Sequence, residues 1–463
     1  MATRISVRGP RRARERIGEP AGEKLGLIGA AEAAEQLGVK LGTLYAYVSR
    51  GWLKSYRRRV GRRALYRRAD IDALRGVVSG EPGRRGRTLP PAATWVTVAQ
   101  PRGLESRPPG VIVAESAVSS IIGGQLAYRG YPIEEVVAHA SFEEACLLLW
   151  NGERPAPKEA AALAAEIENA RTPRSVAAAL AAAGDDAPPL LRMAAVLPIL
   201  AAWDRPHSPR ARIERGRLII AQLPLALPGS DRAAPRAGTG MAGRLLNCAN
   251  RAEGSDWEIR AMNRILAACA EHELNASTFA ARVVASTGAD LFASTLAALC
   301  SLSGPIHGGA CGRIGAMFAE LEAGARLDEC LGAFSRERQL PPGFGHAIYP
   351  GGDPRAVLLR DVAESISRRR GARLFTLARK AEEAVWKRER LRPNLDFYLT
   401  VCALAMGFPR ALPAAIFAIG RAAGWIAHAL EQYADNRLIR PRMRYRGAPL
   451  RHWETPATQG GTP

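Results

Sequence analysis

The sequence contains few cysteines, few aromatic residues and no uninterrupted apolar segment of membrane-spanning length. Its 463 residues include 7 cysteines, an odd number, and no two of them form a CxxC pair. This spacing argues against a zinc site or a disulfide framework and favours free thiols in a reducing compartment. The most apolar stretch, residues 412–430, is interrupted by Arg421, so we expect no helix of about 18 apolar residues that spans a membrane.

Acidic residues are scarce where the chain begins. The formal net charge is +21, and the first 90 residues hold 21 Lys and Arg against 8 Asp and Glu. This asymmetry predicts a nucleic-acid-facing N-terminal segment attached to a nearly neutral body. Three acidic side chains, Glu15, Glu19 and Glu23, argue against a mitochondrial presequence, because presequences are poor in acid. We therefore expect a disordered basic arm over residues 1–24 and a cytoplasmic protein.

Glycine and proline divide the rest of the chain. Both are frequent in residues 79–102, which predicts a linker between a small N-terminal domain and a body that begins near Gly103. The body is rich in Ala and Leu, with helical runs such as 276–298, and is predicted to be mainly α-helical. Strand patterns are few, and we expect Gly110–Ala114 and Gln125–Tyr128 to pair in a small hairpin.

Residues 25–78 alternate short helical and strand-like patterns. We expect helices at Ala30–Leu37 and Leu44–Arg50, strands at Trp52–Arg58 and Arg63–Tyr66, and a last helix at Ile71–Leu74 that Asp70 caps. This order forms a winged helix-turn-helix, and the segment resembles the small modules of MerR-type regulators and excisionases. The resemblance implies DNA contacts from the recognition helix and the wing, through Thr43, Tyr45, Tyr47, Arg50, Arg57, Arg58, Arg59, Arg62 and Arg63. A solvated basic surface or a protein-docking module is the alternative.

Three histidines lie among Gly, Asn and Pro rather than within apolar stripes. Their segments are EHELNAST at 271–278, GPIHGGA at 304–310 and GFGHAIYPGGDPR at 343–355, while NLDFY at 394–398 and RAAGWIAH at 421–428 add a carboxylate and an arginine. Histidine exchanges protons near pH 7, and arginine binds carboxylates through its planar fork. The set therefore predicts acid–base chemistry on an anionic substrate. No metal site is expected, because the sequence has no HxxxH or HExxH pair.

In this order the segments resemble the citrate synthase family. The similarity extends from about Gly103 to Gly447 and includes GLESRPPGVIVAESAVS, QLAYRGYPIEEVV and SFEEACLLLWNGE near its start and RLIRPRMRYRG at its end. The resemblance implies a mainly α, two-domain body, with a large domain over residues 103–311 and 406–455 and a small domain over residues 312–405. It also implies a homodimer with shared active sites.

The same resemblance implies condensation of acetyl-CoA, or another short acyl-CoA, with oxaloacetate to give citrate and CoA, without a permanently bound cofactor. Asp396 would remove a proton from the acyl group, His307 would stabilise the resulting enolate, and His346 would polarise the oxaloacetate carbonyl. The oxaloacetate carboxylates would contact His272, Arg355, Arg421 and Arg440, the last from the other subunit. Arg442 is the second choice for that last role.

Two positions depart from the family pattern. Cys311 stands where the family commonly has Asn, and the run Pro350-Gly351-Gly352 lacks the Lys or Arg with which many members hold CoA phosphates. Two alternatives therefore stay open beside an active synthase. One is a DNA-binding regulator with a degenerate synthase body as its metabolite sensor, and the other is a non-catalytic partner of a second synthase. The acyl length stays undecided, because one methylene is worth only about 1–3 kcal/mol.

Overall fold

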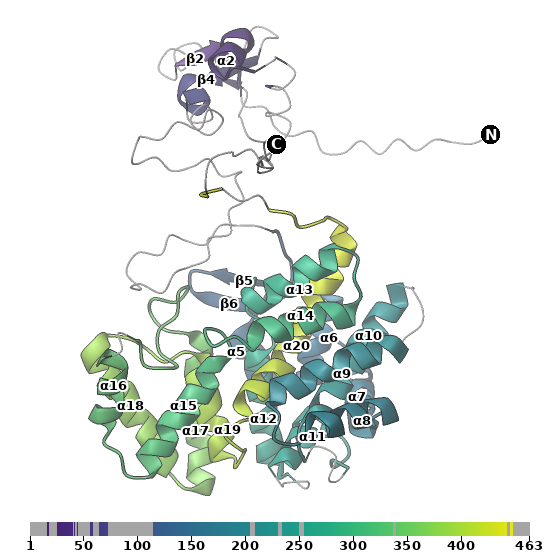
Figure 1. Ribbon diagram of the computed structural model, residues 1–463, viewed down its shortest axis with the longest axis vertical. Helices are drawn as coiled ribbons and strands as arrows, with labels where there is room; N and C mark the ends of the chain where they lie inside the picture. The colour runs from purple at the N-terminus through teal and green to yellow at the C-terminus, as the bar shows by residue number, and fades with distance from the viewer. Residues whose placement is uncertain are drawn as a thin grey trace, which may run out of the picture. The chain divides into compact units, whose positions relative to one another are not determined.

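The chain forms two compact units in its computed structural model. The N-terminal unit comprises Met1–Gln100, Gly110–Val113 and Pro441–Pro463, and the helical body comprises Pro101–Pro109 and Ala114–Arg440 (Figure 1). The structure describes residues 16–17, 26–39, 41, 44, 56–58, 64–72, 114–203, 209–229, 234–249, 254–336, 339–441 and 445–447.

The N-terminal unit contains a sheet and a short helix. In the sheet order β1-β3-β4-β2, β1 (Arg16–Ile17) is parallel to β3 (Tyr56–Arg58), and β4 (Ala64–Arg67) is antiparallel to both β3 and β2 (Leu27–Gly29). Helix α2 (Ala30–Gln36) follows β2 directly. The small apolar core of the unit contains Ile28, Ala33, Ala34, Leu37, Leu44, Tyr66 and Ile71.

The predicted basic wing is present as the β3–β4 pair, in which Tyr56 lies opposite Leu65 and Arg57 lies opposite Ala64. The prediction for the last helix is wrong at its start. Residues 68–72 are already helical, so Asp70 lies inside the helix and is not its N-cap. Most of the predicted recognition helix lies outside the described residues.

The body confirms the predicted mainly α-helical class. Its helices are α5 (Ile133–His139), α6 (Phe142–Asn151), α7 (Pro157–Asn169), α8 (Arg174–Ala183), α9 (Pro189–Trp203), α10 (Pro209–Gln222), the 3-10 helix η2 (Leu223–Ala226), α11 (Gly240–Cys248), α12 (Asp256–Cys269), α13 (Ala276–Ser286), α14 (Leu291–Leu302), α15 (Gly309–Glu322), α16 (Leu327–Arg336), α17 (Pro354–Arg370), α18 (Arg373–Glu389), α19 (Leu395–Ala405) and α20 (Pro413–Asp435). Figure 1 shows α15 to α19 gathered on one side of the body and α7 to α11 on the other, with α20 between them.

The small hairpin of the body differs from the prediction. Strand β6 (Gln125–Tyr128) pairs with β5 (Ser119–Ile122) and with β7 (Tyr131–Pro132), so the predicted pairing with residues 110–114 is wrong. The physical reason is the turn between β5 and β6. Its two residues, Gly123 and Gly124, have φ values of 61° and 83°, and such left-handed glycine pairs favour two-residue hairpins whose twist matches that of the strands.

The predicted helical run over residues 276–298 is two helices, α13 and α14. Gly288 has a φ of 83°, which ends the first helix in a left-handed conformation. The second helix begins where the side chain of Asp290 accepts a hydrogen bond from the Ala293 N–H. An N-cap of this kind satisfies a backbone donor that the first helical turn leaves without a partner.

Helix α20 is the central helix of the body and packs against α6, α12, α13 and α14. It is the one described helix that is long and apolar enough to cross a membrane, but 89% of its most apolar window is buried in the body. Two glycines bring it close to the end of α12. A Cβ on Gly420 would lie 2.7 Å from the Cys269 Cβ, and one on Gly424 would lie 2.5 Å from the Ala270 oxygen.

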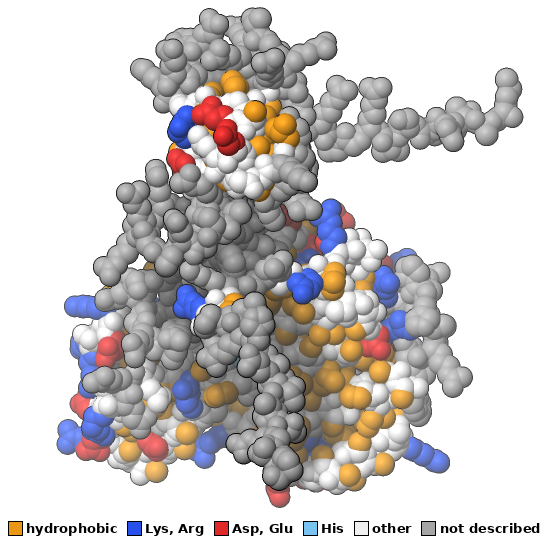
Figure 2. Space-filling model, turned by 45° about the horizontal axis from the view of Figure 1, so that its top comes forward, with side chains coloured by type: hydrophobic (Ala, Val, Ile, Leu, Met, Phe, Trp, Pro, Cys, Tyr) orange, Lys and Arg blue, Asp and Glu red, His pale blue; other side chains and the backbone are white. Residues whose placement is uncertain are grey.

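On the face drawn in Figure 2, the basic side chains of the body stand apart from one another and acidic side chains lie among them. The described basic residues of the body therefore form no continuous patch on this face. This agrees with the sequence, in which most of the net positive charge lies in the first 90 residues.

Candidate active site

The candidate residues lie where helices of the body begin or meet. His272 lies between α12 and α13, His307 directly precedes α15, and His346 lies in the loop before α17. Asp396 is in the first turn of α19, where the Asn394 side chain accepts a hydrogen bond from its backbone N–H at 3.1 Å. Arg421 is in the middle of the buried helix α20. The first turn of a helix has a fixed backbone geometry, so it orients a side chain such as that of Asp396.

His272 and His346 lie side by side with Tyr349. The centroids of the two imidazole rings are 5.1 Å apart, and the Tyr349 ring is 4.8 Å from that of His346. The Tyr349 hydroxyl is 3.0 Å from Nε2 of His272. Burial is the largest cause that lowers the pKa of His272 well below its usual value, and Arg355 adds to it. Both facts describe a neutral imidazole in a fixed orientation.

His346 has a defined tautomer. The backbone N–H of Ile348 donates a hydrogen bond to its Nδ1 at 3.2 Å, so Nδ1 carries no proton when the ring is neutral. The proton is therefore on Nε2. Burial, with Arg355 as the next cause, lowers the pKa of His346 to about 4. At neutral pH the residue can act as an uncharged hydrogen-bond donor through Nε2.

Arg355 is buried and paired within its own helix start. Its Nε and Nη2 donate to the two carboxylate oxygens of Asp353 at 2.9 and 2.7 Å, and the Leu395 N–H donates to the same carboxylate at 3.1 Å. Burial alone would raise the pKa of Asp353, but the Arg355 guanidinium holds it below its usual value. The pair therefore holds the Arg355 guanidinium in a fixed position near the histidines.

Arg421 is buried and makes no ion pair with a carboxylate among the described residues. Its Nε donates to the Cys269 carbonyl oxygen at 2.7 Å, its Cζ lies 4.7 Å from the centroid of the Phe417 ring, and its Nη2 has no hydrogen-bond partner. Burial lowers the pKa of Arg421, the Glu271 carboxylate opposes this effect, and the neighbouring Arg355 adds to it. Two buried guanidinium groups close to each other, one with a free nitrogen, have the charge and the free donor that binding of an anion requires.

His307 also lies near Phe417, with 6.3 Å between the ring centroids. Its Nε2 is 2.9 Å from the hydroxyl of Ser277, which also accepts a hydrogen bond from the Trp425 indole N–H at 3.1 Å. Burial, with Arg421 as the next cause, lowers the pKa of His307 to about 4. The imidazole is thus neutral at physiological pH and held in place by a buried hydroxyl.

Asp396 is half-buried close to a thiol. The Sγ of Cys311, in the first turn of α15, is 3.7 Å from Oδ1 of Asp396. Burial raises the pKa of Asp396 to about 6, against the opposing effect of Arg355. A carboxylate with a pKa in this range is a good general base near neutral pH.

The loops of His346 and Asp396 are connected through their backbones. The Gly345 N–H donates to the Arg392 oxygen at 2.8 Å, and the Asn394 N–H donates to the Gly343 oxygen at 2.9 Å. Gly343 has a φ of 83°, and a Cβ there would lie 2.9 Å from the Phe397 Cβ. Only glycine meets both conditions, and its presence brings the two loops together.

Some of the predicted residues do not lie with the candidate active site, and others are outside the described residues. Arg440 is exposed beyond α20 and makes no hydrogen bond or ion pair within the described residues. The predicted DNA-contacting residues Arg57 and Arg58 lie on strand β3. The others, and Arg442, lie outside the described residues: Thr43, Tyr45, Tyr47, Arg50, Arg59, Arg62 and Arg63.

The sequence analysis missed several residues of this site. Tyr349 and Asp353 belong to the same motif as His346, and Asp353 precedes Pro354 as a predictable N-cap. Ser277 lies in the His272 motif, but nothing in the sequence links it to His307. Among the described residues, no group of three or more His, Cys, Asp or Glu side chains is suited to hold a metal ion.

Comparison with known proteins decides the family. Residues 107–442 match the family model described as citrate synthase, C-terminal domain, and residues 27–75 match that of a helix-turn-helix domain. The chain belongs to the citrate synthase family. Citrate synthase 2 of Bacillus subtilis is 33% identical over 359 residues, which cover 75% of this chain and 95% of that protein. 2-Methylcitrate synthase 2 of Corynebacterium glutamicum is 31% identical over 360 residues, which cover 73% of this chain and 93% of that protein.

Solved structures of citrate synthases have the same fold. The ternary complex of the Thermoplasma acidophilum enzyme with carboxymethyl coenzyme A and oxaloacetate has a TM-score of 0.67 and 27% identity, and it covers 75% of this chain and 97% of that one. The Thermotoga maritima citrate synthase has a TM-score of 0.65 and 30% identity, with 76% and 98% covered. The body of this family member is therefore an acyltransferase of the citrate synthase type, as the sequence motifs predicted.

Proposed function

We propose that this protein condenses acetyl-CoA, or another short acyl-CoA, with oxaloacetate and releases citrate and CoA. The observation that carries the proposal is one arrangement of three groups. His307 and His346 are neutral imidazoles with pKa values of about 4, and the half-buried carboxylate of Asp396 has a pKa of about 6. Enolisation of a thioester needs such a base together with uncharged hydrogen-bond donors for the oxygens on which negative charge develops.

Proton removal is the first step of the proposed reaction. Asp396 takes a proton from the carbon next to the thioester carbonyl, and His307 donates a hydrogen bond to the carbonyl oxygen, which becomes the enolate oxygen. Because Nε2 of His307 faces the Ser277 hydroxyl at 2.9 Å, its Nδ1 is the nitrogen that donates to the thioester. This requires the single proton of the Ser277 hydroxyl to point to Nε2 rather than to Oδ1 of Asn275, which lies 2.8 Å from the same hydroxyl.

Carbon–carbon bond formation follows. His346 donates from Nε2 to the ketone oxygen of oxaloacetate, and the enolate carbon attacks the polarised carbonyl carbon. Water then hydrolyses the citryl thioester, which gives citrate and CoA. The proton that Asp396 removed passes to the oxygen of the former ketone, which becomes the hydroxyl of citrate. In this proposal the protein needs no permanently bound cofactor.

The oxaloacetate carboxylates are assigned to the anion site. His272, Arg355 and Arg421 surround it, and the free Nη2 of Arg421 is a buried donor that a carboxylate would satisfy. Arg440 is assigned to the site of a second copy in a homodimer. Its exposed side chain has no hydrogen-bond partner among the described residues, which supports this assignment.

We propose the same domain boundaries that the sequence motifs predict. Residues 103–311 and 406–455 form the large domain, and residues 312–405 form the small domain, which carries His346, Arg355 and Asp396. Movement of the small domain would open the site for substrates and exclude water on closure. The separate grouping of α15 to α19 in Figure 1 supports this division. All seven cysteines are free thiols, which supports the proposed cytoplasmic location.

Release of free CoA thiol tests the proposed reaction. Purified full-length protein is mixed with oxaloacetate and with acetyl-, propionyl- or butyryl-CoA, and thiol is followed with a chromogenic disulfide. We expect thiol release that depends on oxaloacetate and disappears in Asp396→Asn. A folded dimer that releases no CoA from any of the three would contradict the proposal. The preferred acyl-CoA would separate citrate synthase from 2-methylcitrate synthase activity.

We also propose that the N-terminal unit binds DNA. The match of residues 27–75 to a helix-turn-helix domain supports this, as do the arginines of the β3–β4 wing. The first 90 residues carry most of the net positive charge, which attracts phosphates. The alternative hypothesis, in which the synthase body is a degenerate metabolite sensor of a DNA-binding regulator, is not better supported than the condensation reaction.

Salt-dependent binding of full-length protein to a labelled DNA duplex tests this second function. We expect the logarithm of the affinity to fall linearly with the logarithm of the salt concentration. The double variant Arg57→Glu and Arg58→Glu is expected to lose binding and to keep its condensation activity. Absence of DNA binding by the unaltered protein at low salt would contradict the proposal.

A further inference from the structure

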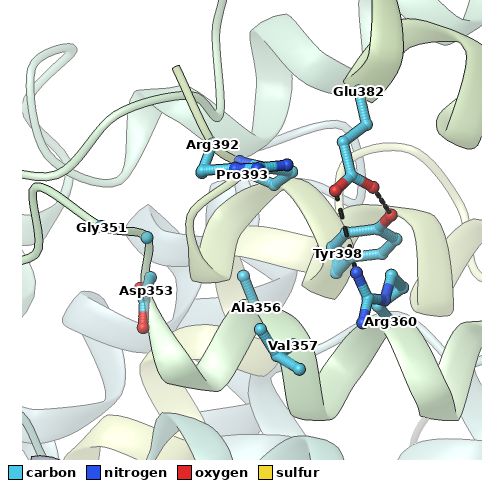
Figure 3. A pocket seen from close by; sticks show the side chains of 10 residues that line it. Gly351, Asp353, Ala356, Val357, Arg360, Glu382, Arg392, Pro393 and Tyr398 are labelled. Carbon is cyan, nitrogen blue, oxygen red and sulfur yellow. Dashed lines mark hydrogen bonds and ion pairs between the residues drawn. The ribbon is translucent and has the colours of Figure 1, made fainter. Parts of the chain in front are cut away.

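A histidine, rather than an arginine, is the partner of the buried carboxylate of Glu271. Figure 3 shows the more usual arrangement at Glu382, which accepts a hydrogen bond from the Tyr398 hydroxyl at 2.6 Å and has Arg360 at 3.9 Å. Glu271 is fully buried, and its Oε1 lies 3.1 Å from Nε2 of His428, which is buried as well. The reaction proposed above gives His428 no role.

The hydrogen bonds of His428 have a fixed direction. Nη1 of Arg282 lies 3.1 Å from its Nδ1, and a guanidinium can only donate, so Nδ1 accepts and the ring proton is on Nε2. Nε2 then donates to the Glu271 carboxylate. The same Nη1 of Arg282 also donates to Oε2 of Glu431 at 2.6 Å. The imidazole of His428 therefore joins α13, through Arg282, to the residue that precedes His272.

The hydrogen bonds continue from Arg282 to the end of α20. Its Nε donates to Oε1 of Gln432 at 3.0 Å, and Nε2 of Gln432 donates to the Arg437 carbonyl oxygen at 2.8 Å. Arg437 lies three residues before Arg440. We call this series of hydrogen-bonded residues the His428 network. Its members are Glu271, His428, Arg282, Gln432 and Arg437.

One end of the His428 network holds the loop of His272. The Ser119 hydroxyl donates to Oε1 of Glu271 at 3.0 Å and accepts a hydrogen bond from the Glu273 N–H at 3.2 Å. The Ile121 N–H donates to the Glu273 carboxylate at 2.9 Å. Glu273 has a φ of 48°, which is uncommon for a residue other than glycine and requires such support. Hydrogen bonds on both sides of His272 therefore fix its backbone.

The other end of the His428 network holds the segment before Arg440. In addition to the hydrogen bond between Gln432 and Arg437, the Ile439 N–H donates to the Ser286 hydroxyl at 3.1 Å. Ser286 is the last residue of α13, the helix that carries Arg282. The segment after α20 is thus tied to the body at two points, the second of them directly before Arg440.

Packing alone does not account for His428. A buried imidazole costs free energy unless its nitrogens are hydrogen-bonded, and an apolar side chain would fill the same space without that cost. Both nitrogens of His428 are used, and each leads to a segment that carries a residue assigned to the oxaloacetate carboxylates. Nε2 leads to His272, and Nδ1 leads to Arg440.

We propose that His428 is a positioning residue for oxaloacetate binding, because the His428 network orients both His272 and the segment that carries Arg440. The inference rests on the proposed condensation, since both residues are assigned to carboxylates of its substrate. Arg440 is assigned to the site of a second copy. In a homodimer the His428 network therefore orients one group of its own active site and one group of the other.

Steady-state kinetics with both substrates tests the proposal. His428→Leu removes two hydrogen bonds and keeps a side chain of similar size. We expect the KM for oxaloacetate to rise about tenfold or more, the effect of losing a hydrogen bond to a charged group, and the KM for acetyl-CoA to stay within about twofold. His428→Gln should recover most of the oxaloacetate affinity, because its amide oxygen can accept from Arg282 while its amide nitrogen donates to Glu271.

Ile426→Ala is the matched control for lost stability. Ile426 is buried on the same helix and lies near α10, where a Cβ on Gly216 would be 3.0 Å from its Cγ2. Its truncation leaves a cavity but removes no hydrogen bond of the His428 network, so neither KM should change by more than about twofold. If Ile426→Ala raised the KM for oxaloacetate as much as His428→Leu does, the positioning role would be wrong.

The His428→Leu variant is expected to fold, because Arg282 keeps Glu431 and Gln432 as partners and Glu271 keeps Ser119. Gln432→Met provides a second test. It leaves the His272 end of the network intact and releases only Arg437, and it should also raise the KM for oxaloacetate selectively. An unchanged KM in Gln432→Met would contradict the proposed link to Arg440.

Calorimetric binding of oxaloacetate without acyl-CoA separates this inference from the proposed reaction. Oxaloacetate should bind His428→Leu at least about tenfold more weakly than the unaltered protein, whether or not turnover occurs. Equal affinity of the two proteins would overturn the positioning role and leave the reaction standing. Absence of turnover in an unaltered protein whose oxaloacetate binding depends on His428 would overturn the reaction alone.

Discussion

The thiol of Cys311 lies 3.7 Å from Oδ1 of Asp396 and is the one side-chain hydrogen-bond donor to that carboxylate among the described residues. Burial raises the pKa of the thiol well above its usual value, so Cys311 stays protonated and acts as a donor. A thiol is a weak donor. It lowers the pKa of the proposed base only slightly, and burial keeps that pKa near 6.

Replacing Cys311 should move the acid side of the pH–rate profile. Asp396 must be ionised to accept a proton, so kcat should fall as the pH drops through about 6. Cys311→Ala removes the donor, raises the pKa of Asp396 and shifts this fall to higher pH. Cys311→Asn offers a stronger donor, lowers that pKa and shifts the fall to lower pH. Measured profiles of kcat against pH between 5 and 8 check both directions.

Cys311→Ser is the control for these two variants, because a hydroxyl donates a hydrogen bond and is close in size to a thiol. Its profile should fall between those of the Asn variant and the Ala variant. Shifts of equal sign in the Ala and Asn variants would show that Cys311 does not act on Asp396 through a hydrogen bond.

Asp396→Asn should lower kcat by roughly 10²–10⁴, the usual contribution of a positioned general base. Its affinity for oxaloacetate should change little, since Asp396 is not among the groups assigned to the carboxylates. Oxaloacetate should therefore still raise the midpoint of thermal unfolding of the variant. A variant with more than a tenth of the original kcat would rule out Asp396 as the base.

Arg421 and Arg355 should respond differently to replacement by Met. Arg421 makes no ion pair with a carboxylate among the described residues, and the nearby Glu271 carboxylate keeps His428 as its partner, so Arg421→Met should cost only about 1–2 kcal/mol of the free energy of unfolding without ligand. Arg355→Met leaves the buried Asp353 carboxylate without its cation and should cost about 3–5 kcal/mol. Urea unfolding of both variants gives the two values.

Oxaloacetate provides the second measurement for these arginines. The ligand should raise the unfolding midpoint of the unaltered protein, because it binds only the folded state. Arg421→Met should lose most of this increase while remaining folded. A full oxaloacetate effect in Arg421→Met would contradict its assignment to the carboxylates.

Gly424→Ala should destabilise the body by about 3 kcal/mol, since overpacking of this kind is costly. The new Cβ would lie 2.0 Å from Oε2 of Glu271 and 2.5 Å from the Ala270 oxygen, and backbone atoms cannot move aside easily. Gly312→Ala is the matched control in helix α15, where a Cβ would meet no atom within 4 Å. It should gain about 0.5–1 kcal/mol, because alanine favours helices over glycine. Thermal or urea unfolding checks both signs.

Local patterns of the sequence predicted much of this protein. The Gly-rich segments around His307 and His346 and the Asn394 cap before Asp396 depend on neighbours within a few residues, so they can be recognised without the fold. The β3–β4 wing was predictable for the same reason. The β5–β6 pairing was missed, although the Gly123-Gly124 turn is also a local signal.

Contacts between distant segments were not predictable. The Tyr349 hydroxyl lies beside His272, a residue 77 positions away, and the Ser277 hydroxyl lies beside His307 at a separation of 30. Each pair exists because loops and first helical turns from distant parts of the chain meet in the folded body. The sequence alone does not show which residues so far apart in the chain come into contact in the folded protein.

The sequence by itself determined the helical class, the family and the identity of the groups that can carry the chemistry. Only the tertiary structure decided their protonation and partners. Burial lowers the pKa of His307 and His346 and raises that of Asp396. Desolvation depends on the packing of the whole body, and the approach of Cys311 to Asp396 depends on α15 lying against α19 across 85 residues of chain.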